Sequence, residues 1–223
     1  MAMEESIAYD RGTTAPKRQT DTRPAMDYLF LSGVVALDFV NTEVLVRGKR
    51  RDLFATPEDV AHWWQQAFTH YPDGEKVKAD TSAIVWSVQL LERVKQVRAA
   101  IRTLCTNLVE QQPVDGEALT TLNTILAMGY PALEAASGQE MVPIYRTHDD
   151  QGAILLPIAL SALHLFTHAE KHRLHKCNNE RCILFFYDTT KSATRRWCSL
   201  ECMNRARSLQ HYRHVKEEQT FTR

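Results

Sequence analysis

The chain has 223 residues, of which 44% are hydrophobic and 24% are charged, and its 27 basic and 27 acidic residues leave no formal net charge. This length and composition are typical of a globular protein with one substantial core and a small appendage, or with two small domains. The sequence has no apolar run near the roughly 20 residues that a membrane helix needs, and its first residues do not resemble a secretory leader. We therefore expect a cytoplasmic protein with no membrane partner.

The first part of the chain predicts a flexible arm followed by a helical domain. Residues 1–25 are polar and aperiodic, which is typical of a flexible N-terminal arm. Residues 26–172 predict a mainly α-helical domain. The first apolar segment in it, 28–42, favours a helix, although its β-branched residues also allow a strand. Thr56 and Pro57 then give a strong helix start, because Thr is a good N-cap and Pro is favoured at the first helical position.

The clearest helical periodicity lies between Thr81 and Gln112, where apolar residues recur every three or four positions. Cys105 falls on this apolar stripe, so we expect a buried small side chain and not a reactive thiol. The other elements expected in this domain are a helix from 115 to 128 and a strand over 141–146. The segment 153–174 is expected to contain a further helix, which starts near Pro157.

Charge is distributed unevenly along the chain. Residues 1–170 carry 15 Lys and Arg against 22 Asp and Glu, whereas residues 171–216 carry 11 against 3. A basic segment is often only a solvated surface, but this one coincides with a cluster of cysteines. The two parts of the chain therefore face different partners.

Four of the five cysteines lie within 26 residues, in the pattern C-x4-C, a gap of fifteen residues, and C-x3-C. In a reducing compartment such a cluster favours metal ligands over disulfides. Tetrahedral Zn²⁺ needs four soft donors, and each short spacing lets one turn or helix start supply two of them. The alternatives are unrelated reduced thiols and a redox switch that releases the metal. We expect one structural Zn²⁺ bound by Cys177, Cys182, Cys198 and Cys202.

The sequence around these cysteines predicts a small finger. Residues 183–188 have the composition of a strand, residues 189–197 that of a polar turn, and a helix is expected from Ser199 to about Lys216. A two-cysteine knuckle, a hairpin and then a helix carrying the other two ligands is the order of a treble-clef-like zinc finger, which we place at 173–216. Residues 217–223 are left as a C-terminal tail. The expected fold class is therefore mainly α, with a helical domain followed by a treble-clef-like finger.

The finger also predicts a nucleic-acid surface. If Cys202 points inward on the final helix, the opposite face of that helix presents polar and basic side chains. Basic groups fixed by zinc can contact phosphates, and Asn or Arg side chains can reach base edges in a DNA groove. The residues expected to bind DNA on this reasoning are Lys191, Arg195, Arg196, Asn204, Arg207 and His211.

These residues resemble two known families. The string CNNERCILFFYDTTKSATRRWCSLECMNR (177–205) is similar to the CGNR-type zinc finger. The strings VALDFVNT (35–42), RG (47–48) and DLFATPEDVAHWW (52–64) resemble the ABATE domain, which precedes that finger in bacterial proteins regarded as stress-induced transcriptional regulators. The resemblance covers nearly the whole chain after residue 28.

The resemblance implies a DNA-binding regulator. By position it assigns the motif's Asn and Arg to Asn204 and Arg205, which adds Arg205 to the expected DNA-binding residues. Met203 stands where the family name has Gly, and a position that accepts Met does not require a positive φ. The zinc ligands do not depend on this departure.

The helical domain is too large to serve only as a spacer, so we expect it to form a homodimer or to bind a small-molecule effector. Candidate polar groups for an effector pocket are Asp38, Asn41, Thr42 and Arg47. The alternative is that these side chains cap the end of the first helix.

Three classes of function remain open. The leading one is a DNA-binding transcriptional regulator that recognises double-stranded DNA. The second is a zinc-stabilised protein- or RNA-interaction module, because fingers of this kind bind many partners. The third is an enzyme, which we do not expect, because the sequence has no glycine-rich phosphate loop, nucleophile elbow or open metal site.

Overall fold

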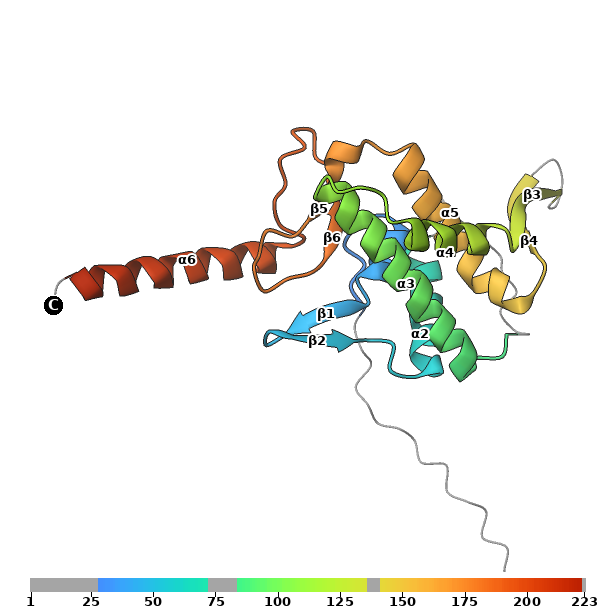
Figure 1. Cartoon of the computed structure of the whole chain (residues 1–223), viewed down its shortest axis with the longest axis horizontal. Helices are drawn as coiled ribbons and strands as arrows, with labels where there is room; N and C mark the ends of the chain where they lie inside the picture. The colour runs from blue at the N-terminus through green and yellow to red at the C-terminus, as the bar shows by residue number, and fades with distance from the viewer. Residues whose placement is uncertain (1–27, 72–83, 136–140, 222–223) are drawn as a thin grey trace, which may run out of the picture.

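The computed structural model describes residues 28–71, 84–135 and 141–221, which form six α-helices and three two-stranded antiparallel sheets (Figure 1). The fold is therefore mainly α, as expected. The predicted arm at 1–25 lies outside the described residues. The elements are α1 (Val35–Val40), β1 (Glu43–Val46), β2 (Lys49–Asp52), α2 (Pro57–His70), α3 (Val88–Val109), α4 (Gly116–Leu126), β3 (Gly129–Ala135), β4 (Met141–Thr147), α5 (Asp150–Thr167), the 3₁₀ helix η2 (Lys171–Arg173), β5 (Leu174–Lys176), β6 (Phe185–Tyr187) and α6 (Leu200–Phe221).

We call residues 28–172 the body and residues 173–216 the finger. The core of the body surrounds α1, whose six residues are all buried. Phe39 on α1 packs against Phe54 and Trp63, with ring centroids 6.0 and 5.5 Å apart. Aromatic side chains remove roughly 150–250 Å² each from water when buried, so this cluster is a main source of stability. Cys105 is also fully buried, as predicted, and burial raises the pKa of its thiol to about 12.

Two helix starts follow from local capping. Pro57 is the first residue of α2, as predicted, and the Asp59 carboxylate accepts hydrogen bonds from the backbone of Ala55 and Thr56. At α4, the Asp115 carboxylate accepts a hydrogen bond from the Ala118 N–H at 2.8 Å. The bonds from Thr56 and Ala118 satisfy N–H groups that a helix leaves without a partner at its N-terminus.

The expected helix start at Thr81 is wrong for the residues that the structure describes. Residues 84–87 are not helical, and α3 begins at Val88, where the Ser87 hydroxyl accepts a hydrogen bond from the Leu90 N–H at 3.2 Å. Residues 81–83 lie outside the described residues. Apolar periodicity therefore located the helix, whereas the serine cap decides where it begins.

The expected start of the next long helix, near Pro157, is wrong as well. The helix α5 begins at Asp150, where the Asp149 carboxylate accepts a hydrogen bond from the Gly152 N–H at 2.7 Å. Pro157 lies inside the helix and is buried. Packing of α5 against α1, α3 and α4 outweighs the backbone hydrogen bond that proline cannot donate.

The end of α5 also differs from the prediction. The helix ends at Thr167, because the N–H groups of His168 and Ala169 both bond to the His164 carbonyl. Among the described helices, α5 is the one whose length and apolar composition would suffice to cross a membrane, with a mean hydropathy of 1.2. Ten of its residues are buried, so α5 is the central helix of the body core.

Two β-hairpins in the body were not fully predicted. In β1–β2, Arg47 and Gly48 have φ angles of 51° and 78°, the positive values that a two-residue type I′ turn requires. Gly129 was expected to stop a helix but begins β3, where a Cβ atom would lie 2.2 Å from the Arg146 carbonyl oxygen. The predicted strand at 141–146 is confirmed as β4, the partner of β3.

The finger joins the body through one short hairpin. The predicted order, with a hairpin between the two cysteine pairs, is wrong: β6 pairs instead with β5, which precedes Cys177. Successive strand side chains point to opposite faces, so Phe185 enters the body core whereas Phe186 packs beside the cysteines. The last helix, α6, projects away from the body and continues past the expected end at Lys216 to Phe221 (Figure 1).

Candidate metal centre and basic surface

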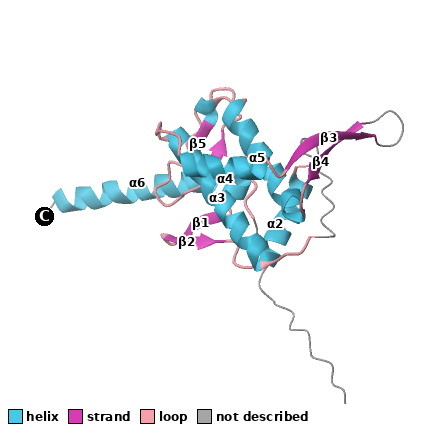
Figure 2. Ribbon diagram, turned by 45° about the vertical axis from the view of Figure 1, so that its right-hand side comes forward, coloured by secondary structure: helices cyan, strands magenta, loops and turns pink. Residues whose placement is uncertain are grey.

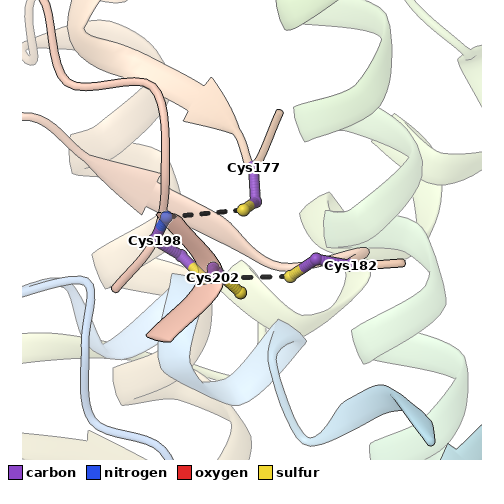
Figure 3. Close-up of side chains that lie close together, drawn as sticks. All are labelled: Cys177, Cys182, Cys198 and Cys202. Atoms are coloured by element: carbon purple, nitrogen blue, oxygen red, sulfur yellow. Dashed lines mark hydrogen bonds between the residues drawn. The ribbon is translucent and has the colours of Figure 1, made fainter. Parts of the chain in front are cut away.

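The four clustered cysteines come from two places in the finger. Cys177 and Cys182 lie in the loop of the β5–β6 hairpin, and Cys198 and Cys202 lie just before and within the first turn of α6 (Figure 3). Their four sulfur atoms are all within 4.8 Å of one another. The Sγ atoms of Cys182 and Cys198 are 3.8 Å apart, which matches the roughly 3.8 Å edge of a tetrahedron with Zn–S bonds of about 2.3 Å. This donor set fits Zn²⁺.

Backbone hydrogen bonds hold the cysteines in place. The Cys198 N–H points at the Cys177 sulfur, 3.5 Å away, and the Cys202 N–H donates to the Ser199 hydroxyl at 3.2 Å. Asn179, which sequence reasoning missed, is buried between the two pairs and donates to the Cys202 carbonyl at 3.0 Å. An Asn inside a C-x4-C spacing is the signal that could have identified it, because Asn side chains commonly bond nearby backbone in tight turns.

The electrostatics of the cluster favour a cation. Hydrogen bonds from Cys182 and Cys198 lower the pKa of the Cys177 thiol, and the same bonds raise the pKa of Cys182 and Cys198. Four thiolates this close repel one another, so protons or a metal ion must share the site. Binding of Zn²⁺ is therefore coupled to proton release.

The loop between the cysteine pairs is fixed by Asp188, another residue that sequence reasoning missed. Its buried carboxylate accepts hydrogen bonds from the N–H groups of Thr190 and Arg195, at 2.9 and 2.7 Å. Burial by itself would raise the pKa of Asp188, but these bonds outweigh it and lower that pKa to about 2. The carboxylate is therefore charged at neutral pH and holds the loop in one conformation.

Arg195, predicted to contact DNA, is turned inward instead. Its Nε donates to the Trp197 carbonyl at 2.9 Å, and its guanidinium also bonds to the Cys198 carbonyl. The same guanidinium lies over the Phe186 ring, 4.6 Å from the centroid. Arg195 therefore supports the backbone at a zinc ligand.

The other six predicted DNA-binding residues are exposed, and the three of them that line grooves lie in two different grooves. Arg196 and Arg207 line an open groove of about 510 Å³ between the cysteine knuckle and α6. Arg205 lines a different groove of about 400 Å³, which also borders Arg47 and the β1–β2 hairpin. The exposed residues are Lys191, Arg196, Asn204, Arg205, Arg207 and His211.

An ion pair sets the direction of α6 relative to the knuckle. The Arg213 guanidinium donates to both carboxylate oxygens of Glu180, at 2.9 and 2.6 Å. The hydrogen bond from Arg213 lowers the pKa of Glu180. Both side chains are exposed, so the pair contributes little to stability and mainly orients α6.

The four residues predicted to form an effector pocket are not brought together. Asp38 is buried, accepts hydrogen bonds from the backbone of Ser32 and from the Tyr71 hydroxyl, and has its pKa raised by burial. Thr42 is also buried and donates to the Phe39 carbonyl at 2.7 Å. Arg47 instead lies exposed in the turn of β1–β2.

Asn41, the fourth of these residues, joins the body to the finger. Its Nδ2 donates to the Phe185 carbonyl at 2.8 Å, and its Oδ1 accepts from the Phe185 N–H at 2.9 Å. Arg102, which sequence reasoning missed, donates to the carbonyls of Ile183 in the finger and Val40 in the body, at 3.0 and 2.6 Å. These two side chains supply hydrogen bonds across the joint, where Lys176 and Glu110 also form an exposed ion pair at 3.1 Å.

A separate hollow of about 580 Å³ lies between the start of α1, the end of α5 and the strand β6. Val34, Val35 and Leu165 give it an apolar floor, and His164 and Tyr187 add polar groups. It contains none of the residues predicted for an effector.

Comparison with known proteins gives two matches. The ABATE family, described as "Putative stress-induced transcription regulator", matches residues 33–169, more than half of the chain. The CGNR zinc finger matches residues 173–214, which contain all four clustered cysteines. A search of the curated proteins found no match. The finger match and the cysteine geometry together assign one structural Zn²⁺ to this site.

Proposed function

Because the chain belongs to the ABATE family and ends in a CGNR zinc finger, we propose that it is a transcriptional regulator that binds double-stranded DNA through the finger. The knuckle in a hairpin loop, followed by a helix with two ligands, supports a treble-clef-like finger. Four protein ligands leave no open position on zinc, so we propose no catalytic role for the metal. Reduced thiols favour action in the cytoplasm.

The observation that carries this proposal is the groove lined by Arg196 and Arg207. Arg196 lies two residues before Cys198, and Arg207 lies five residues after Cys202, so zinc would anchor the backbone that carries both guanidinium groups. Arginine groups that are preorganised in this way suit phosphate oxygens, which they contact in bidentate geometry. The surrounding segment 171–216 is strongly basic, which adds long-range attraction to a polyanion.

The position of α6 supports a duplex as the partner. The helix projects away from the body (Figure 1), and the major groove of B-DNA is wide enough to admit an α-helix. Asn204 and His211 are exposed on α6, where they can reach base edges while Arg196 and Arg207 contact the backbone. Lys191, in the preceding loop, adds another exposed cation.

The body supplies dimerisation or effector binding in this proposal. The hollow bordered by Val34, His164 and Tyr187 is the better effector site, because it is open and reaches from the body to a finger strand. Asp38, Asn41 and Thr42 are buried and already hydrogen-bonded, so they act as structural groups.

The test is the salt dependence of binding to mixed-sequence duplex DNA, measured by fluorescence anisotropy. Replacing both Arg196 and Arg207 with Ala should weaken binding and reduce the slope of log K against log salt by about 2, since two phosphate contacts are lost. Arg146→Ala removes an equally exposed guanidinium from β4, outside the finger, and should change neither quantity. A double variant that behaves like Arg146→Ala would contradict the proposal.

A second candidate is binding of single-stranded RNA, which Trp197 favours. Its ring is half-buried in the same groove, with the Arg196 guanidinium 5.5 Å from the ring centroid. Aromatic rings beside cations serve as stacking platforms for unpaired bases. Competition between duplex DNA and RNA of the same length decides between the two, and preference for RNA that is lost in Trp197→Ala would establish this second candidate.

A further inference from the structure

The ribbon formed by β3 and β4 carries an unusual apolar face. The two strands pair in register from Gly129↔Thr147 to Ala135↔Met141, so alternate residues of each strand share one side. On one side, the residues beyond the first pair are the half-buried Tyr145 and otherwise apolar residues. We call its five exposed members the ribbon face: Pro131, Leu133, Ala135, Met141 and Pro143.

This side of the ribbon is covered by the body at its base. A Cβ atom on Gly129 would lie 3.0 Å from the side chain of Leu156 on α5, and one on Gly152 would lie 2.9 Å from the Thr147 side chain. Figure 2 shows the ribbon extending beyond α5. At this outer part, Leu133 and Met141 are 67% and 68% exposed. The apolar surface that contacts α5 at the base of the ribbon therefore continues outward as the ribbon face, which the described residues leave exposed.

The opposite side of the ribbon has a different character. It carries Tyr130, Glu134 and Arg146, all exposed, among half-buried apolar residues. A charged and mixed surface of this kind is typical of a solvated strand face. A contiguous apolar patch of a few hundred Å² is often functional, so the apolar side is the better candidate for a contact.

We propose that the ribbon face is the surface through which two copies of this chain associate. A two-fold interface brings a patch against its own copy, so a charged patch would meet its like charge. The ribbon face has no charged residue, and it is therefore compatible with itself. The basic finger lacks this property, because the segment 171–216 carries 11 Lys and Arg against 3 Asp and Glu.

The prolines indicate face-to-face packing and not extension of the sheet. Pro131 in β3 and Pro143 in β4 have no N–H group, so each strand lacks a backbone donor that an added strand would need.

The size of the patch indicates a weak dimer. Its five partly exposed apolar side chains cover on the order of 400 Å² per copy, about half of what one partner contributes to a standard interface. The dimer should therefore dissociate on dilution.

This inference deepens the dimerisation part of the proposed function, because a dimer presents two fingers to two half-sites on DNA. Its test uses no DNA. A chain that fails to bind DNA can still form the dimer, and a monomeric chain can still bind DNA through one finger, so the two proposals fail separately.

The experiment is sedimentation velocity of the full zinc-loaded chain over a dilution series from the submillimolar to the low micromolar range. The wild-type chain should shift from dimer to monomer, and Leu133→Lys should weaken the dimer at least about tenfold, because two buried like charges would face each other. Val114→Lys is the matched control, since Val114 is 69% exposed but lies outside the ribbon. Circular dichroism and zinc content confirm that each variant is folded.

A mixing experiment tests whether the partner is a second copy. An equimolar mixture of Leu133→Lys and Leu133→Glu chains should form a tighter dimer than either chain forms alone, because opposite charges then meet across the interface. A wild-type chain that stays monomeric at every concentration overturns the proposal, as does a dimer that survives Leu133→Lys. A monomer whose ribbon face binds anionic phospholipid vesicles instead also overturns it.

Discussion

The body and the finger of this protein are held together by different means. The body buries large apolar side chains from five helices, among them Phe39, Trp63 and Ile154. The finger has a small cluster of its own, in which Leu184 and Phe186 pack beside the cysteines. A segment of this size cannot bury enough apolar surface to fold alone, so bonds to zinc replace much of the missing core. Loss of the metal should therefore unfold the finger, whereas loss of apolar contacts should unfold the body.

Removal of the metal should have the largest effect on the finger and little effect on the body. Replacing both Cys198 and Cys202 with Ser should abolish stoichiometric zinc, because structural zinc in small fingers contributes on the order of 10 kcal/mol. Amide hydrogen exchange should then become fast over 188–216, while α3 and α5 stay protected. Cys105→Ala, which removes the one cysteine outside the cluster, should retain zinc. Fast exchange throughout the body of the double variant would contradict separate means of stabilisation.

The joint between the two regions should give a smaller effect. Asn41→Ala removes both hydrogen bonds to the Phe185 backbone and leaves a buried N–H and carbonyl without a partner. We expect a loss of about 2 to 4 kcal/mol in the free energy of unfolding, measured by urea denaturation, with zinc content unchanged.

Asn107→Ala is the control for the joint. Asn107 also donates to a backbone carbonyl, that of Pro113, but this bond is exposed, so its loss should cost under about 1 kcal/mol. Equal losses for the two variants would show that Asn41 does not fasten the finger to the body.

Elements and ligands with local signals were predictable from the sequence. Pro57 after a capping Thr located the start of α2, and apolar periodicity located α3. The cysteine spacing predicted all four zinc ligands, because coordination geometry restricts which short spacings can supply paired sulfurs. Each of these signals lies within a few residues of the feature that it predicts.

Features that depend on distant contacts were not predictable. Pro157 suggested a helix start, but burial of α5 among other helices keeps it inside the helix. Asn41 and Arg102 bond to the finger across more than 80 residues of sequence, and no pattern in one sequence reports such a pairing. The charge of Arg195 suggested a DNA contact, whereas the packing around Phe186 turns it inward.

Arg195 and Arg196 are neighbours in the sequence with opposite orientations. If the inward groups of the finger hold its metal site, replacing Arg195 should affect zinc binding and replacing Arg196 should not. Arg195→Ala leaves the Trp197 and Cys198 carbonyls without their donor, at a cost of about 1 to 3 kcal/mol. Arg196→Ala changes only an exposed side chain.

The direct measurement is competition for zinc between each variant and a chromophoric chelator. Arg195→Ala should bind zinc about tenfold or more weakly, whereas Arg196→Ala should bind it like the wild-type chain. Equal zinc affinities for Arg195→Ala and the wild-type chain would contradict this expectation.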